Sequence, residues 1–121
     1  RNFAKSQIYS TALPPSVLAA CIQSLKIISK KNLGKKALKN ANYFCELMNL
    51  PKAQSAIVAI ILGDEKKVLE VAKKIRKKGF LISAIRPPTV ENGKARLRIT
   101  FSTNHQKKHI EKLVNCLKTL L

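Results

Sequence analysis

Residues 95–101 alternate strictly between apolar and polar side chains, and this alternation constrains the fold more than any other feature of the sequence. In a strand the two sets would lie on opposite faces: Leu97, Ile99 and Phe101 against Arg96, Arg98 and Thr100. Such a strand has one dry face and one wet face. We therefore expect a sheet whose apolar face is covered by helices and whose other face is open.

Two further segments have the composition of strands. Residues 55–62 form a short, β-branched apolar run that ends at Gly63-Asp64, which predicts a buried strand. Residues 80–85 predict a second strand, and an Asn92-Gly93 turn signal lies in the loop that follows it. The last two strands are therefore expected to pair as an antiparallel hairpin.

Two helices are predicted before the first strand. The first begins at Pro15 or Ser16, because proline is tolerated in the first turn of a helix. The second runs from Leu33 to Met48 and stops before Pro51.

Two more helices are predicted after it. One follows Asp64, a favourable N-cap, and ends before Gly79, while the other is capped by Thr103 or Asn104 and reaches the C-terminus. The element order is then α-α-β-α-β-β-α. This order predicts an α+β fold, with a small antiparallel sheet of about three strands and helices on one face.

The chain carries 24 Lys and Arg against 6 Asp and Glu, a formal net charge of +18. Charge of this sign favours polyanions, so nucleic-acid binding is one interpretation. The cations interleave with apolar residues at helical spacing, however, and the few aromatic residues do not alternate with them. The pattern favours a lysine-rich solvated surface.

The three cysteines are widely spaced and form no Cys-x-x-Cys pair: Cys21, Cys45 and Cys116. They indicate free thiols in a reducing compartment, and hence a cytoplasmic protein, rather than a disulfide framework or a zinc site. The longest apolar run, residues 56–62, is far shorter than the ~20 residues of a membrane span.

His105 and His109 are four residues apart on the last predicted helix, with Cys116 seven residues further on. That spacing is compatible with a metal, but no carboxylate joins it at ligand spacing. Capping or surface roles explain both histidines better, and no metal is expected.

Arginine is rare in this chain, yet three of its five arginines fall within residues 86–98: Arg86, Arg96 and Arg98. A guanidinium grips a carboxylate with two parallel hydrogen bonds, which lysine cannot do. These residues therefore suggest carboxylate recognition. The alternative is a cationic edge strand or a salt bridge such as one to Glu91.

The same residues resemble a known family. The motif Ile-Arg-Pro-Pro-Thr-Val (85–90), the later Gly93 and Arg-Leu-Arg-Ile-Thr (96–100) are similar to the C-terminal domain of the α-oxoamine synthases. Three more stretches agree in order and spacing: residues 8–15 around Ser10-Thr11, residues 55–64 with Leu-Gly-Asp, and Ser-Thr-Asn-His at 102–105. The Arg-Pro-Pro element favours the 8-amino-7-oxononanoate synthase branch. Glu91, in place of the family's proline, and Ala12, in place of a sibling's serine, depart from the pattern.

This resemblance implies an acyltransferase of the aspartate-aminotransferase fold with pyridoxal 5′-phosphate as cofactor. It would condense L-alanine with a pimeloyl thioester, with loss of carbon dioxide, in biotin biosynthesis. The thioester carrier is either coenzyme A or a carrier protein. The alternatives are a sibling synthase of the 5-aminolevulinate synthase or 2-amino-3-ketobutyrate ligase type, or a non-enzymatic basic module.

The resemblance also implies how the chain is divided. Residues 1–31 would be an extended segment and linking helix that follow an upstream large domain, and residues 32–121 the C-terminal small domain. The catalytic lysine would lie upstream, so no catalytic residue is expected here and this segment alone would be inactive. The enzyme would be a homodimer, without nucleic acid or membrane as partner.

Five residues acquire roles from the resemblance. Arg98 would hold the amino-acid carboxylate, Thr89 would lie at the substrate, and Arg86 would serve the acidic end of the substrate or the loop itself. Thr11 and Ser10 would reach the cofactor phosphate of the partner subunit.

Overall fold

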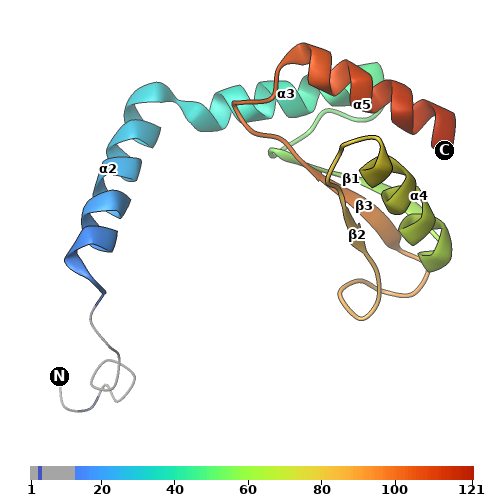
Figure 1. Ribbon diagram of the computed structural model, residues 1–121, viewed down its shortest axis with the longest axis horizontal. Helices are drawn as coiled ribbons and strands as arrows, with labels where there is room; N and C mark the ends of the chain where they lie inside the picture. The colour runs from blue at the N-terminus through green and yellow to red at the C-terminus, as the bar shows by residue number, and fades with distance from the viewer. Residues whose placement is uncertain (1–2, 4–12) are drawn as a thin grey trace. The chain divides into compact units, whose positions relative to one another are not determined.

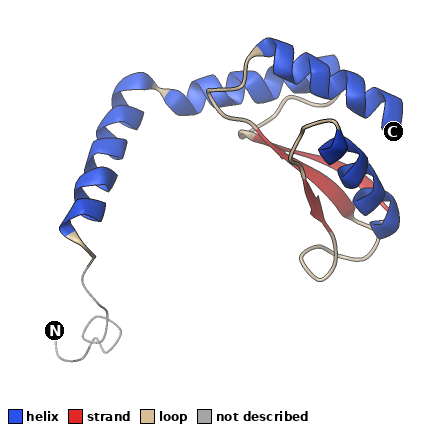
Figure 2. Ribbon diagram, in the orientation of Figure 1, coloured by secondary structure: helices blue, strands red, loops and turns tan. Residues whose placement is uncertain are grey.

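The computed structural model describes residue 3 and residues 13–121, which form two units, Arg1–Asn32 and Leu33–Leu121. The described elements are α2 (Pro15–Lys31), α3 (Leu33–Leu47), β1 (Ile57–Gly63), α4 (Glu65–Lys77), β2 (Ser83–Ile85), β3 (Ala95–Thr100) and α5 (Lys107–Leu120) (Figures 1 and 2). This succession confirms the predicted element order and the α+β class.

The first unit contributes α2. The helix has Pro15 in its first turn, as expected, and ends at Asn32, whose φ of 48° is left-handed. None of its side chains is buried, and Leu25 and Ile28 of its apolar stripe are 64% and 52% exposed. That this unit follows an upstream large domain stays a prediction.

The second unit is built on a three-stranded sheet with the order β1-β3-β2. Both neighbours pair with β3 in antiparallel orientation, and β3 lies between them in Figure 2. The predicted hairpin of the last two strands is therefore confirmed. Its loop contains a cis bond between Pro87 and Pro88 and turns at Gly93, whose φ of 76° is readily adopted by glycine.

Helices α3, α4 and α5 cover one face of this sheet (Figure 1). The alternation in β3 decides which face, because Leu97 and Ile99 are buried whereas Arg98 and Thr100 are exposed. The buried core also takes residues from every helix of the unit: Ala41, Phe44, Cys45, Val68, Val71, Ile75, Ile110, Leu113, Val114 and Leu117.

The strand predicted at 55–62 is present as β1, but the prediction that it is buried is wrong. β1 is an edge strand with alternating burial, so that Val58 and Ile60 face the core while Ile57 and Ile61 are 50% and 58% exposed. The helices of this unit cover only the side of the sheet that carries Val58.

The second strand is shorter than residues 80–85. After α4 the chain closes the helix end, because the N–H groups of Gly79 and Phe80 donate to the carbonyls of Arg76 and Ile75. The ladder with β3 consequently begins at Ser83.

Of the N-caps predicted for α4 and α5, one is confirmed and the other is wrong. Asp64 caps α4 as predicted, since its carboxylate accepts a 2.6 Å hydrogen bond from the Lys67 N–H. The prediction of Thr103 or Asn104 as the cap of α5 is wrong: Gln106 caps this helix in a capping box with His109. Residues 102–105 form a turn instead, in which the His105 N–H donates to the Ser102 carbonyl.

Among the residues that the structure describes, no helix is long and apolar enough to cross a membrane. Cys21, Cys45 and Cys116 are all free thiols, exposed, buried and half-buried respectively.

Candidate functional site

The candidate site is the open face of the sheet. Register places residues from all three strands side by side on this face, in rows across β1, β3 and β2. Two rows carry arginines: Ala59, Arg98 and Ser83 form one, and Ile61, Arg96 and Ile85 form the next. The period of two along β3 therefore sets both guanidinium groups on the side opposite the helices.

Arg98 lies in the centre of this face with small neighbours on both sides. Ala59 of β1 and Ser83 of β2 are its register partners, and all three residues are exposed. Within residues 13–121, no salt bridge or side-chain hydrogen bond engages its guanidinium. Its donors are therefore available for a carboxylate that approaches from the open side.

Arg96 is held differently. Its Nε donates a 2.9 Å hydrogen bond to the Lys94 carbonyl, which fixes the plane of the guanidinium. It is half-buried, with Ile61 and Ile85 as its register partners. Arg96 and Arg98 thus share one face, as the sequence predicted. Of these two residues, only Arg98 has no guanidinium N–H group that donates a hydrogen bond within the described chain.

The loop between β2 and β3 carries the other two predicted residues. Arg86 and Thr89 are both exposed, and the Thr89 N–H donates a 3.0 Å hydrogen bond to the Arg86 carbonyl. A hollow of about 430 Å³ opens under this loop, lined by Pro88, Thr89, Val90, Glu91, Lys94 and Arg96. The structure therefore brings Thr89 and Arg96 to the same hollow. Arg96 was a candidate for carboxylate recognition from its residue type, but the resemblance assigned it no role.

Glu91 forms an ion pair with Lys94. The alternative explanation of the arginines as partners of Glu91 is therefore not supported, because the carboxylate is already matched by a lysine two residues before Arg96.

The shifted pKa values lie in the helical layer. Burial raises the pKa of the Cys45 thiol, and the hydrogen bond from the Tyr43 hydroxyl to Glu111 raises the pKa of Tyr43. The ion pair with Lys74 at 2.6 Å lowers the pKa of Glu70.

The histidines take structural roles. His105 precedes α5, so the expected pair on one helix face does not form. The Nδ1 atoms of His105 and His109 accept from the backbone N–H groups of Ser102 and Gln106, at 3.2 and 3.4 Å. Over the described part of the chain, no three His, Cys, Asp or Glu side chains gather as a metal site.

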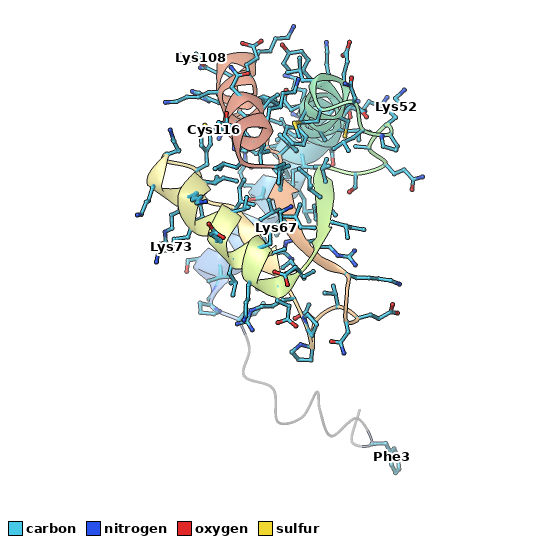
Figure 3. All side chains as sticks on the ribbon, turned by 90° about the vertical axis from the view of Figure 1, so that its right-hand side faces the viewer. Phe3, Lys52, Lys67, Lys73, Lys108 and Cys116 are labelled. Carbon is cyan, nitrogen blue, oxygen red and sulfur yellow. The ribbon has the colours of Figure 1, made fainter. Side chains whose placement is uncertain are left out.

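Most of the described lysines lie at exposed positions of the helices, whereas Lys52 and Lys94 lie in loops. The cations of α4 are exposed, and Lys73 and Lys108 point outward from α4 and α5 in Figure 3. This placement agrees with the solvated lysine surface that the sequence indicated. Ser10 and Thr11 lie outside the described residues.

Comparison with known proteins agrees with the fold. A family model described as aminotransferase class I and II matches residues 1–117. The 8-amino-7-oxononanoate synthase of Maricaulis maris is 38% identical over the whole chain, and that of Saccharophagus degradans is 40% identical over 99% of it. The chain spans 31% and 32% of these two proteins.

Two solved structures share the architecture. The 8-amino-7-oxononanoate synthase of Francisella tularensis superposes with a TM-score of 0.74 at 26% identity, covering 98% of this chain and 36% of that one. The serine palmitoyltransferase of Sphingomonas wittichii gives 0.78 at 24% identity, covering 93% and 30%, and shows the fold alone. Sequence and structure together place the chain in the aminotransferase class I and II family.

Proposed function

We propose that this chain is the C-terminal part of a pyridoxal-phosphate-dependent α-oxoamine synthase that condenses L-alanine with a pimeloyl thioester. The observation that carries the proposal is Arg98, which presents an unengaged guanidinium at the centre of an open sheet face. The curated relatives named 8-amino-7-oxononanoate synthase, at 38–40% identity, support the choice of reaction.

Arg98 binds the carboxylate of the amino-acid substrate. A planar guanidinium can donate two parallel hydrogen bonds to a carboxylate, and β3 holds the stem of the side chain rigidly because the strand is paired on both sides. Ala59 and Ser83 leave space around it. The residue therefore positions L-alanine for the reaction.

The loop residues Thr89 and Arg86 are proposed to act beside Arg98. Thr89 is exposed at the rim of the hollow under the loop, where its hydroxyl can hydrogen-bond substrate. Arg86 is exposed directly after β2 and adds positive charge to the loop. Both are positioning groups in this proposal.

The unengaged guanidinium fits an enzyme of this type, because the amino-acid substrate needs a carboxylate anchor. Pyridoxal phosphate, when bound, supplies the electron sink for loss of carbon dioxide. Thr11 and Ser10 are proposed to reach the cofactor phosphate of a partner subunit, so the proposed enzyme is a homodimer. A cytoplasmic location is part of the proposal and rests on the three free cysteines. The rest of the cofactor site would come from upstream, so residues 1–121 alone would be inactive.

The proposal is tested on the full-length protein. Product formation is measured with L-alanine, glycine and L-serine, each offered with pimeloyl-, succinyl- and palmitoyl-coenzyme A. We expect the highest kcat/KM for L-alanine with the pimeloyl thioester. Preference for glycine or for L-serine would instead indicate a sibling synthase.

A further inference from the structure

The hollow under the loop between β2 and β3 combines cationic groups with aliphatic walls. Pro88 and Val90 supply apolar surface, and Arg96 and Thr89 supply polar groups. The hollow lies at the end of the open face, since Arg96 is the register partner of Ile61 and Ile85. An aliphatic chain that runs over this face toward Arg96 would therefore meet hydrocarbon on the way.

Arg96 is the uncompensated charge of this hollow within the described residues. Lys94 also lines it, but its ammonium group is paired with the Glu91 carboxylate. The Arg96 Nε is committed to the Lys94 carbonyl, so the terminal nitrogens of the guanidinium remain as donors. A half-buried cation with free, fixed donors and no partner is a binding group for an anion.

We propose that this hollow binds the free carboxylate at the far end of a dicarboxylic acyl substrate, with Arg96 as its binding partner. The inference rests on the proposed function, in which the acyl group is pimeloyl. Arg96 and Arg98 are two residues apart on one face, about 7 Å by strand rise. That separation is comparable to the length of an extended pimeloyl chain. One arginine thus serves the amino acid, and the other serves the acid end of the acyl group.

This division of roles makes Arg96 a specificity residue. An acyl chain of the same length without the terminal carboxylate leaves the guanidinium without its partner, so it loses the charge-assisted hydrogen bonds. The hollow then recognises the distal carboxylate of the acyl group, and not only the length of the acyl chain.

The test compares pimeloyl-coenzyme A with heptanoyl-coenzyme A, which has the same chain length and lacks the distal carboxylate. Full-length Arg96→Met and Arg96→Lys variants are assayed with both thioesters at saturating L-alanine. We expect Arg96→Met to lower the ratio of kcat/KM for pimeloyl over heptanoyl about 10- to 100-fold, mainly through KM. Arg96→Lys should restore part of the ratio because it keeps the charge.

Arg76→Met is the matched control, because it removes an exposed arginine from α4 without touching the hollow. The ratio of kcat/KM for pimeloyl over heptanoyl in this variant should equal that of the wild type. An unchanged ratio in Arg96→Met, or an equal loss on both thioesters, would overturn the inference and leave the proposed function standing. A wild-type enzyme that uses neither thioester with L-alanine would contradict the proposed function, and the inference would fail with it.

Discussion

Arg98 of β3 pairs in register with Ala59 of the edge strand β1. The side chain of its cross-strand partner on that side is therefore a single methyl group. Ser83 has the same relationship to Arg98 from β2. Cross-strand partners of this kind stand close enough for their side chains to interact. The surroundings of Arg98 are therefore set by two small residues that are distant from it in sequence.

Replacing Arg98 by lysine should keep the positive charge but remove the two parallel hydrogen bonds to the carboxylate. We expect Arg98→Lys to weaken L-alanine binding to the full-length enzyme by about 1.5–3 kcal/mol, the net worth of charged hydrogen bonds. Binding of the thioester should change much less. Titration of the cofactor absorbance with L-alanine measures the effect. The comparison variant is Arg96→Lys, which should be milder for L-alanine. A larger loss in this variant would mean that Arg96 is the carboxylate anchor.

A carboxylate placed at position 59 should compete with the substrate. Ala59→Glu would put an acidic side chain directly across from Arg98, where opposite charges attract by about 0.2–1 kcal/mol. We expect the KM for L-alanine to rise about 1.4- to fivefold, the factor to which that energy corresponds. Ile57→Glu is the control, because its register partner on the same face is Thr100. If both variants raise the KM equally, the charge acts over the whole face rather than on Arg98.

Loss of the cap of α4 should destabilise the small unit. Asp64→Ala removes the hydrogen bond to the Lys67 N–H, and we expect the free energy of unfolding to fall by about 1 kcal/mol. Urea denaturation followed by circular dichroism measures it. Asn104→Ala provides the contrast, because this residue lies in a turn before α5 and does not cap the helix. A comparable loss in both variants would count against the assigned helix starts.

The buried thiol should resist alkylation. Burial raises the pKa of Cys45, so less thiolate is present at a given pH in the folded chain than in the unfolded chain. We expect iodoacetamide at about pH 8.5, near the usual thiol pKa, to label Cys45 more slowly than half-buried Cys116. Peptide mass spectrometry follows both rates, and urea should abolish the difference.

The same shift fixes the sign of a pH effect. The folded state holds the Cys45 proton more tightly than the unfolded state does, so this residue adds stability below the usual thiol pKa. That contribution is lost as the pH rises through the raised pKa. Cys45→Ser should flatten the decline at alkaline pH. A decline of the same slope in this variant would assign it to other groups.

Local patterns predicted the elements that depend on neighbours in sequence. The alternation at 95–101 gave β3 and its two faces, and Asp64 and Gly79 marked the limits of α4. The boundaries that failed depend on other segments. β2 starts late because Phe80 is bound to the end of α4, and α5 starts late because residues 102–105 close a turn.

Some features of the candidate site could likewise be predicted from local sequence, and others could not. Arg96 and Arg98 could be placed on one face from the sequence, because a strand repeats every two residues. The hollow could not be anticipated, because it depends on how the loop brings Thr89 and Arg96 to one lining and on the ion pair between Lys94 and Glu91. β1 was misjudged because its run of apolar residues does not reveal that the strand lies at an edge.

The position of β3 in the sheet also bears on how this chain is synthesised. β3 is the last of the three strands to leave the ribosome, yet it is the strand that joins the other two. β1 and β2 share no ladder in the finished sheet, so neither has its partner while translation is still short of residue 95. A nascent chain interrupted at that point lacks the sheet and both Arg96 and Arg98. The strand that completes the sheet therefore also carries the two arginines of its open face.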